Sequence, residues 1–241
     1  MTTLSIGWLY PTTMNIYGDR GNVIALSRRA EWRGLCPATR FIGIGDEIPD
    51  DIDVFFIGGG QDQEQVAVSR DLEGSKGHKI ASAVEAGTSL LAVCGGYQLF
   101  GHEYRPHNAA PLPGVGLFDL ETTAGDERFI GNVVVDSQWG ELVGFENHSG
   151  LTTLAAGVKP LGTVRIGRGN NGRDGTEGVV YRHAIGCYLH GSLLPKNPVL
   201  TDWLISSALS RRGIELPPTS MDDRQEMAAH ASAVKRAIQT R

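Results

Sequence analysis

One cysteine stands between an apolar run and two glycines in the segment LLAVCGGYQLFG, residues 90–101. The apolar run 88–93 predicts a buried strand, and the residues after the two glycines predict the start of a helix. A strand that ends in one residue, turns sharply and continues as a helix is the layout of a nucleophile elbow. This segment therefore indicates an α/β fold that presents one side chain at the carboxyl end of a central strand.

The first half of the chain alternates apolar runs with helical patterns, which predicts βαβ units and a parallel sheet. The expected strands are 4–10, 53–60 and 88–93, and the expected helices are 22–32 and 76–86. Asp19 has a side chain suited to capping the first helix, and Gly34 has the backbone freedom to end it.

The second half of the chain predicts short strands separated by turn residues, and these suggest antiparallel additions to the sheet. The expected short strands are 115–121, 130–135, 141–145, 162–166 and 178–182, and a further apolar strand is expected at 185–191. A helix is expected over 197–213, and a short helix from Asp222 onward. The organisation we predict is one domain over 1–213 and a C-terminal helical tail over 214–241.

The composition of the chain argues against several classes of protein. The net charge of −5 argues against a nucleic-acid surface, and no apolar run approaches the ~20 residues that cross a bilayer. The N-terminal segment lacks the pattern of a secretory leader. The cysteines Cys36, Cys94 and Cys187 are widely separated, which disfavours both a disulfide scaffold and a metal site. We therefore expect a cytoplasmic protein without a bound metal.

Cys94 is the candidate nucleophile of the elbow. A helix that starts directly after it brings backbone N–H groups close to the sulfur and favours the thiolate. The alternative is a buried structural cysteine, which is the usual fate of a free thiol. A buried structural cysteine does not require the two glycines that follow Cys94, so the interpretation of Cys94 as a nucleophile is favoured.

Three glycines follow the expected strand in DVFFIGGGQDQEQ, residues 53–65. They free the backbone at the same edge of the sheet as Cys94, where N–H groups can bind an anion. We expect an oxyanion hole formed by the N–H groups of Gly60 and Gly95. The alternative, a plain turn from a strand to a helix, needs one glycine rather than three.

A general base is expected near the nucleophile, because thiol hydrolysis uses a Cys-His pair. His190 follows the apolar strand of IGCYLHG and therefore lies at a strand end, as Cys94 does. His148 in FENHSG is the rival, and most of the other histidines lie in polar surroundings. Cys187, three residues before His190, is assigned to the core.

Three motifs together resemble the class I glutamine amidotransferases of the cobyric acid synthase type: LLAVCGGYQLFG, FFIGGGQDQEQ and GCYLHG. YGDRGN, FENHSG and GRGNNGRDGTEGVVY are more narrowly similar to the GatD family, the glutaminase subunits of lipid II isoglutaminyl synthase. The likeness covers residues 4–210, and the tail beyond Gly213 adds nothing to it. Ala92 departs from the wider superfamily, where glycine is common. The resemblance implies the flavodoxin-like fold of these enzymes, a parallel central sheet flanked by helices.

The resemblance also implies an activity and a partner. The activity is hydrolysis of L-glutamine to glutamate and ammonia through a thioester on Cys94. The partner is a MurT-like Mur ligase subunit in a heterodimer, which uses ATP and magnesium to amidate D-glutamate in the lipid II stem peptide, near the inner membrane face. No GxxxxGKS or GxxxxGKT phosphate loop occurs in the chain, so we expect no cofactor on it and a separate ATP-using subunit.

Other functions remain open from the sequence alone. The same elbow suits a cobyric-acid-type amidotransferase subunit that serves another acceptor, or a different cysteine hydrolase such as a peptidase. A non-enzymatic interaction subunit that kept the fold is a further alternative, although Cys94, His190 and the glycines argue against it.

Three further residues carry hypotheses. Arg128 resembles the family's substrate-binding arginine, and its planar guanidinium suits a carboxylate, although a solvated charge is the default for its acidic surroundings. Asp19 is either the cap of the first helix or a contact to substrate or partner. Ser192 stands where the superfamily commonly has a Glu that orients the catalytic histidine. Either a Cys-His pair suffices, or an acidic side chain from the partner completes the triad, in which case the chain alone has weak glutaminase activity.

Overall fold

The computed structural model describes residues 2–190 and 193–240. Its central sheet has the strand order β11-β12-β4-β3-β1-β2, and every neighbouring pair is parallel except β11 with β12. The strands are β1 Thr3–Leu9, β2 Cys36–Ile42, β3 Val54–Ile57, β4 Ser89–Val93, β11 Val179–Tyr181 and β12 Ala184–Cys187.

The five parallel strands follow the flavodoxin-like order 2-1-3-4-5 when they are counted along the chain, and this is the fold that the family resemblance implies. All residues of β3, β4 and β12 are buried, because helices cover both faces of the sheet. The connection direction reverses between β1 and β3, and ligand sites in such sheets lie at the carboxyl ends of the strands beside this point.

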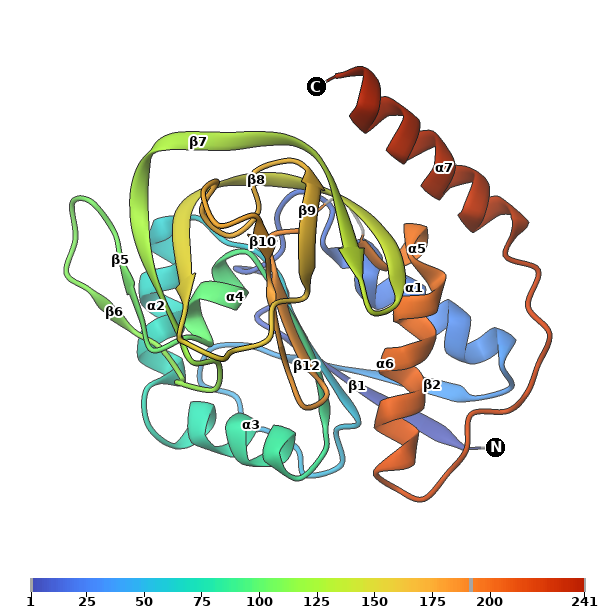
Figure 1. Ribbon diagram of the computed structural model, residues 1–241. Helices are drawn as coiled ribbons and strands as arrows, with labels where there is room; N and C mark the ends of the chain where they lie inside the picture. The colour runs from blue at the N-terminus through green and yellow to red at the C-terminus, as the bar shows by residue number, and fades with distance from the viewer. Residues whose placement is uncertain (1, 191–192, 241) are drawn as a thin grey trace.

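Helices lie on both sides of the sheet, with α1 and α6 on one face and α2 and α3 on the other (Figure 1). The helices are α1 Arg20–Trp32, α2 Asp62–Leu72, α3 Ser75–Glu85, α4 Gly95–Leu99, α5 Leu193–Lys196, α6 Pro198–Ser210 and α7 Arg224–Gln239. No helix among the described residues is long and apolar enough to span a membrane.

A second sheet lies over the carboxyl ends of the parallel strands, where β7 and β8 arch across the molecule (Figure 1). Its path is β10-β9-β7-β5-β6, and β8 pairs with β7. The strands are β5 Glu103–Arg105, β6 Leu112–Pro113, β7 Leu120–Ser137, β8 Gly140–Leu154, β9 Gly162–Ile166 and β10 Thr176–Glu177.

The long hairpin of β7 and β8 corrects the sequence prediction of separate short strands. β7 has 18 residues and β8 has 15, and the pairing register shifts between Ala124 and Phe129. Polar residues at this irregularity interrupt the apolar pattern, so the sequence predicts two fragments, 115–121 and 130–135, in the region of β7 and only the fragment 141–145 in β8. The irregularity is a β-bulge, a feature that often lies beside a functional site.

Several elements were not expected from the sequence, among them the short β5, β6 and α5 and the longer β2 and α2. β2 is an edge strand with one fully buried residue, Ile42, so it lacks a strong apolar signal. α2 is polar on most of its surface and directly follows the three glycines. The predicted strand 185–191 also ends early, because β12 stops at Cys187 and the chain then leaves the sheet.

The C-terminal tail forms the helix α7 of 16 residues rather than a short helix. Its Ala237 packs against Val134, Val143 and Ile166 in a small apolar cluster on the outer side of the second sheet. His230 Nδ1 also lies 2.8 Å from the carbonyl oxygen of Lys196. These contacts attach the tail to the β7-β8 arch.

Candidate active site

Cys94 lies at the turn between β4 and α4 in a backbone conformation that bulky residues rarely adopt. Its φ is 53° and its ψ is −110°, and positive φ in a non-glycine residue often marks a functional site. The N–H of Cys94 donates to the carbonyl of Cys187 at 2.8 Å, and the N–H of Gly96 donates to Gly58 at 3.1 Å. The structure therefore has the geometry of the predicted nucleophile elbow.

The three glycines after β3 are required by space rather than by backbone conformation. A methyl group at Gly59 would lie 2.8 Å from Cε1 of His190 and 3.3 Å from Cβ of Cys94. A methyl group at Gly58 would lie 2.7 Å from the carbonyl oxygen of Met14. A methyl group at Gly60 would collide with the sulfur of Met14. Gly59 therefore lies where Cys94 and His190 come together, and no larger residue fits there.

The N–H groups predicted to form the oxyanion hole are available for a ligand. Gly60 lines the cleft in front of Cys94, and Gly95 directly follows it. Neither N–H donates a hydrogen bond to any residue in the ranges 2–190 and 193–240. A methyl group at Gly95 would collide with Nε2 of Gln65, so a larger residue there would displace that side chain.

His190 is held by the second sheet rather than by the central sheet. Its N–H donates to the carbonyl of Phe145 at 2.8 Å, and its carbonyl accepts from the N–H of Phe145 at 3.1 Å. The imidazole is completely buried. Its Nε2 has no nitrogen or oxygen partner in the described part of the chain, and the side chain of Cys94 is close enough to interact with the imidazole.

Asp19 holds the other nitrogen of His190. The Nδ1 atom lies 3.0 Å from Oδ1 and 3.1 Å from Oδ2 of Asp19, and both side chains are fully buried. The N–H of Gly59 also donates to Oδ2 of Asp19 at 2.8 Å. Nδ1 is thereby fixed as the protonated nitrogen of the neutral ring, and Nε2 is left as the base.

This arrangement corrects two sequence-based interpretations. The side chain of Asp19 does not cap α1, and its buried carboxylate orients His190 instead of contacting solvent or a partner. An acidic side chain from a partner is not needed at Nδ1, because Asp19 of the same chain already accepts its hydrogen bond. Ser192, where the acid was sought, lies outside the described residues.

The surroundings of His190 favour its protonated form. Burial by itself lowers the pKa of His190, but the interactions with Cys94 and with Asp19 outweigh burial and raise the pKa to about 10. At neutral pH the imidazole is therefore a cation next to the sulfur. Such a group can give a proton to a leaving amine.

His148 lines the same cleft but is unsuited to be the base. Burial lowers its pKa to about 3, and its ring stacks on Tyr188 with a centroid separation of 3.5 Å. Its Nδ1 lies 2.9 Å from the carbonyl oxygen of Gly150. Cys187 is fully buried, as the sequence predicts, and burial raises the pKa of its thiol.

Arg128 stands at the rim of the cleft, at the end of the β-bulge in β7. Its Nε donates to Oδ1 of Asn147 at 2.7 Å, and its Nη2 donates to the hydroxyl of Tyr17 at 3.1 Å. The cleft has a volume of about 640 Å³ and also contains Cys94. Arg128 is therefore an oriented side chain at the entrance to the site, not an isolated surface charge.

A buried polar network lies beneath the cleft and was not identified from the sequence. Gln65 Nε2 donates to Oε1 of Gln98 at 3.0 Å, and Gln98 Nε2 donates to the hydroxyl of Tyr188 at 3.1 Å. The position of Gln98, one helical turn after Cys94, was the available signal for it. Tyr17, Gln65 and Asn147 lie in the motifs YGDRGN, FFIGGGQDQEQ and FENHSG, which was the signal for them, but only the tertiary fold shows that they line one cleft.

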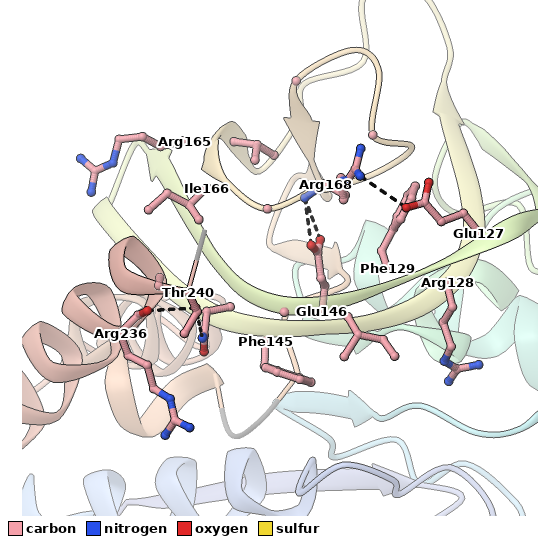
Figure 2. A pocket seen from close by; sticks show the side chains of 18 of the residues that line it. Glu127, Arg128, Phe129, Phe145, Glu146, Arg165, Ile166, Arg168, Arg236 and Thr240 are labelled. Carbon is pink, nitrogen blue, oxygen red and sulfur yellow. Dashed lines mark hydrogen bonds and ion pairs between the residues drawn. The ribbon is translucent and has the colours of Figure 1, made fainter.

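A larger hollow of about 880 Å³ lies beside the bulge, between β7, β9 and the end of α7. Figure 2 shows Arg128 leaving the strand on the side opposite to Arg168, whose guanidinium is paired with Glu127. Glu146 accepts hydrogen bonds from the N–H of Arg168 at 2.9 and 3.0 Å. The positive side chains of this hollow diverge, and it contains neither Cys94 nor His190.

Comparison with known sequences identifies relatives over nearly the whole chain. Residues 5–198 match the CobB/CobQ-like glutamine amidotransferase domain. The GatD subunit of lipid II isoglutaminyl synthase (glutamine-hydrolyzing) from Staphylococcus aureus is 38% identical over 98% of this chain and 97% of that protein. The subunit of the same name from Streptococcus pneumoniae is 36% identical over 96% of this chain and 92% of that protein.

The similarity to these two relatives extends through the C-terminal tail, which corrects the expectation that the likeness stops near residue 210. Among solved structures, PurLQS from Thermotoga maritima is similar with a TM-score of 0.58 at 15% identity. That comparison covers 89% of this chain and 100% of the other, and it supports the fold alone.

Proposed function

This chain belongs to the CobB/CobQ-like glutamine amidotransferase family and is a glutamine-hydrolysing enzyme, and we propose from this premise that it is the glutaminase subunit of a lipid II isoglutaminyl synthase. The observation that carries the chemistry is the buried position of His190, oriented by Asp19 and adjacent to Cys94. The similarity to both GatD subunits over nearly their full length supports the assignment to this synthase.

The first half of the reaction forms a thioester. The sulfur of Cys94 attacks the side-chain amide carbon of glutamine, and the N–H groups of Gly60 and Gly95 bind the oxygen that becomes negative. The imidazolium of His190 gives its Nε2 proton to the amide nitrogen, so the C–N bond breaks and ammonia leaves. Asp19 keeps Nδ1 protonated throughout this step.

The second half of the reaction releases glutamate. A water molecule attacks the thioester carbon while Nε2 of His190, now neutral, takes its proton. The C–S bond then breaks, glutamate leaves, and the thiolate of Cys94 and the imidazolium of His190 are restored. Arg128 binds the α-carboxylate of glutamine in this proposal, because it lies at the rim of the cleft with its guanidinium held in place.

The ammonia is used by a partner in this proposal. The chain carries no phosphate-binding loop, so a MurT-like Mur ligase subunit with ATP and magnesium supplies the activated carboxylate. The acceptor is the D-glutamate of the lipid II stem peptide, and the complex works in the cytoplasm at the inner membrane face. Ammonia released into solvent would be lost, which favours a tight complex of the two subunits.

Glutamate release from glutamine by the purified chain tests the chemistry, with Cys94→Ser as the inactive control. Adding a MurT-like subunit, ATP, magnesium and lipid II tests the acceptor, with amidated lipid II as the product. Glutaminase activity without amidated lipid II would favour the alternative of a cobyric-acid-type subunit for another acceptor. Cleavage of peptides but not of glutamine would indicate a different cysteine hydrolase. Equal kcat/KM with and without the partner would contradict the sequence-based expectation that the chain alone is weak.

A further inference from the structure

The loop segment 16–19 contacts three separate parts of the active site. The N–H of Ile16 donates to the carbonyl of Gly59 at 3.3 Å, which joins the loop to the glycine turn. The hydroxyl of Tyr17 accepts from Arg128, and the carboxylate of Asp19 accepts from His190. The residue that binds substrate in our proposal and the residue that transfers protons are therefore linked through one short loop.

Tyr17 occupies this loop in an unfavourable backbone conformation. Its φ is 53°, which is rare for a bulky side chain and persists only where surrounding contacts enforce it. Its ring packs edge-on against the imidazole of His190, with a centroid separation of 5.2 Å and an interplanar angle of 78°. Tyr17 is 43% exposed while His190 is fully buried, so Tyr17 lies between the imidazole and the solvent.

The other contact of Tyr17 fixes Arg128. The guanidinium is held at Nε by Asn147 and at Nη2 by Tyr17, and Nη1 has no acceptor in the described part of the chain. An exposed arginine without such contacts samples many rotamers, and binding a ligand then costs conformational entropy. Two fixed hydrogen bonds remove much of that cost before glutamine arrives.

We propose that Tyr17 is a positioning residue for glutamine recognition, whose hydroxyl holds Arg128 toward the α-carboxylate and whose ring shields His190 from solvent. The inference rests on the proposed role of Arg128 in substrate binding. Tyr17 itself forms no bond with the reacting atoms. Its two contacts predict two separable effects, one on substrate affinity through the hydroxyl and one on turnover through the ring.

The first test is Tyr17→Phe, which removes the hydroxyl and keeps the ring. We expect the KM for glutamine to rise about 3- to 10-fold with kcat within about twofold of the original, because one hydrogen bond to a charged group is lost. Tyr17→Ala is expected to raise KM equally and also to lower kcat. Tyr181→Phe is the matched control, since it removes another exposed tyrosine hydroxyl, bonded to Glu85 far from the cleft.

The second test separates this inference from the role of Arg128. Arg128→Ala is expected to raise KM, and Tyr17→Phe is expected to add nothing further in that background, which a double-mutant cycle measures. For 4-aminobutanamide, which is glutamine without its α-carboxylate, Tyr17→Phe is expected to have no effect. The inference fails if Tyr17→Phe leaves KM unchanged while Arg128→Ala raises it, or if the two effects add. An unchanged KM in Arg128→Ala would overturn the role of Arg128 and this inference with it.

Discussion

Nδ1 of His190 lies 3.0 Å from Oδ1 of Asp19, although 171 positions separate the two residues in the chain. The loop after the first strand thus supplies the acid that orients a histidine located after the last parallel strand. Because both side chains are buried, the hydrogen bond is shielded from water and from salt. The chain thus brings Cys94, a buried histidine and the carboxylate that holds this histidine into one site.

Asp19→Asn is expected to lower kcat by about 100-fold with little change in KM, because the amide cannot stabilise the imidazolium. The alkaline limb of the pH profile of kcat/KM is also expected to shift to lower pH. In the original protein the pKa of His190 is about 10, and Asp19 contributes to raising it, so its loss moves the limb to lower pH. Steady-state rates from pH 6 to 11, with the melting temperature as the folding control, measure both effects. An unchanged limb would mean that another acid supports His190.

Gly59→Ala is expected to reduce kcat by about 100-fold, because the added methyl group would displace His190 or Cys94 from the reactive geometry. Gly131→Ala is the matched control, since a methyl group there meets no atom within 4 Å among the described residues. Labelling of Cys94 by a glutamine-like alkylating reagent provides a second measurement. Equal activity of the two variants would show that the glycine turn tolerates a side chain.

Glu177 makes the stability depend on pH. Burial raises the pKa of Glu177 to about 8, far above the ordinary 4.5, so folding favours the protonated carboxyl. The stabilisation by this proton is complete below about pH 4.5 and is lost as the pH rises through 8. Glu177→Gln keeps an oxygen to accept from the N–H of Tyr188 and cannot ionise. We expect the variant to gain unfolding free energy relative to the original between pH 6 and pH 9, as measured in urea; a constant difference would contradict this.

Ala237→Asp is expected to detach α7 and to lower the unfolding free energy by about 1–3 kcal/mol, because it places a charge against Val134 and Val143. Removal of residues 214–241 should expose the same two valines and lower the melting temperature. Met227→Asp, on an exposed position of the same helix, is the control for an added charge. An unchanged melting temperature after truncation would mean that the tail does not support the fold.

The residues next to strand ends were predictable from the sequence. Cys94, Gly60 and His190 each follow an apolar run, and parallel strands bring their carboxyl ends to one edge of a sheet. A parallel sheet could be expected for the same reason, whereas its flavodoxin-like order was implied only by the family resemblance, because β2 has no strong apolar pattern. The local sequence pattern is therefore sufficient to place a residue that directly follows a single predicted strand.

The roles that depend on contacts between distant elements were not predictable. Asp19 stands at the start of a helix, where capping explains an aspartate equally well, and only the fold shows its carboxylate facing His190. The long hairpin was also missed, since the polar residues of its bulge interrupt the apolar alternation. Arg128, which donates to the hydroxyl of Tyr17, lies in the same bulge. The segment of β7 that lacks the regular alternation of apolar residues is therefore the segment nearest the cleft.

His190 follows β12, the last parallel strand along the chain, so the site is completed late during synthesis. A nascent chain that ends before His190 already contains the nucleophile and the glycine turn, but it lacks the proton carrier. The ribosome therefore never exposes a functional glutaminase before most of the polypeptide has been made. Chains that stop before His190 are therefore expected to hydrolyse no glutamine, however well their first parallel strands fold.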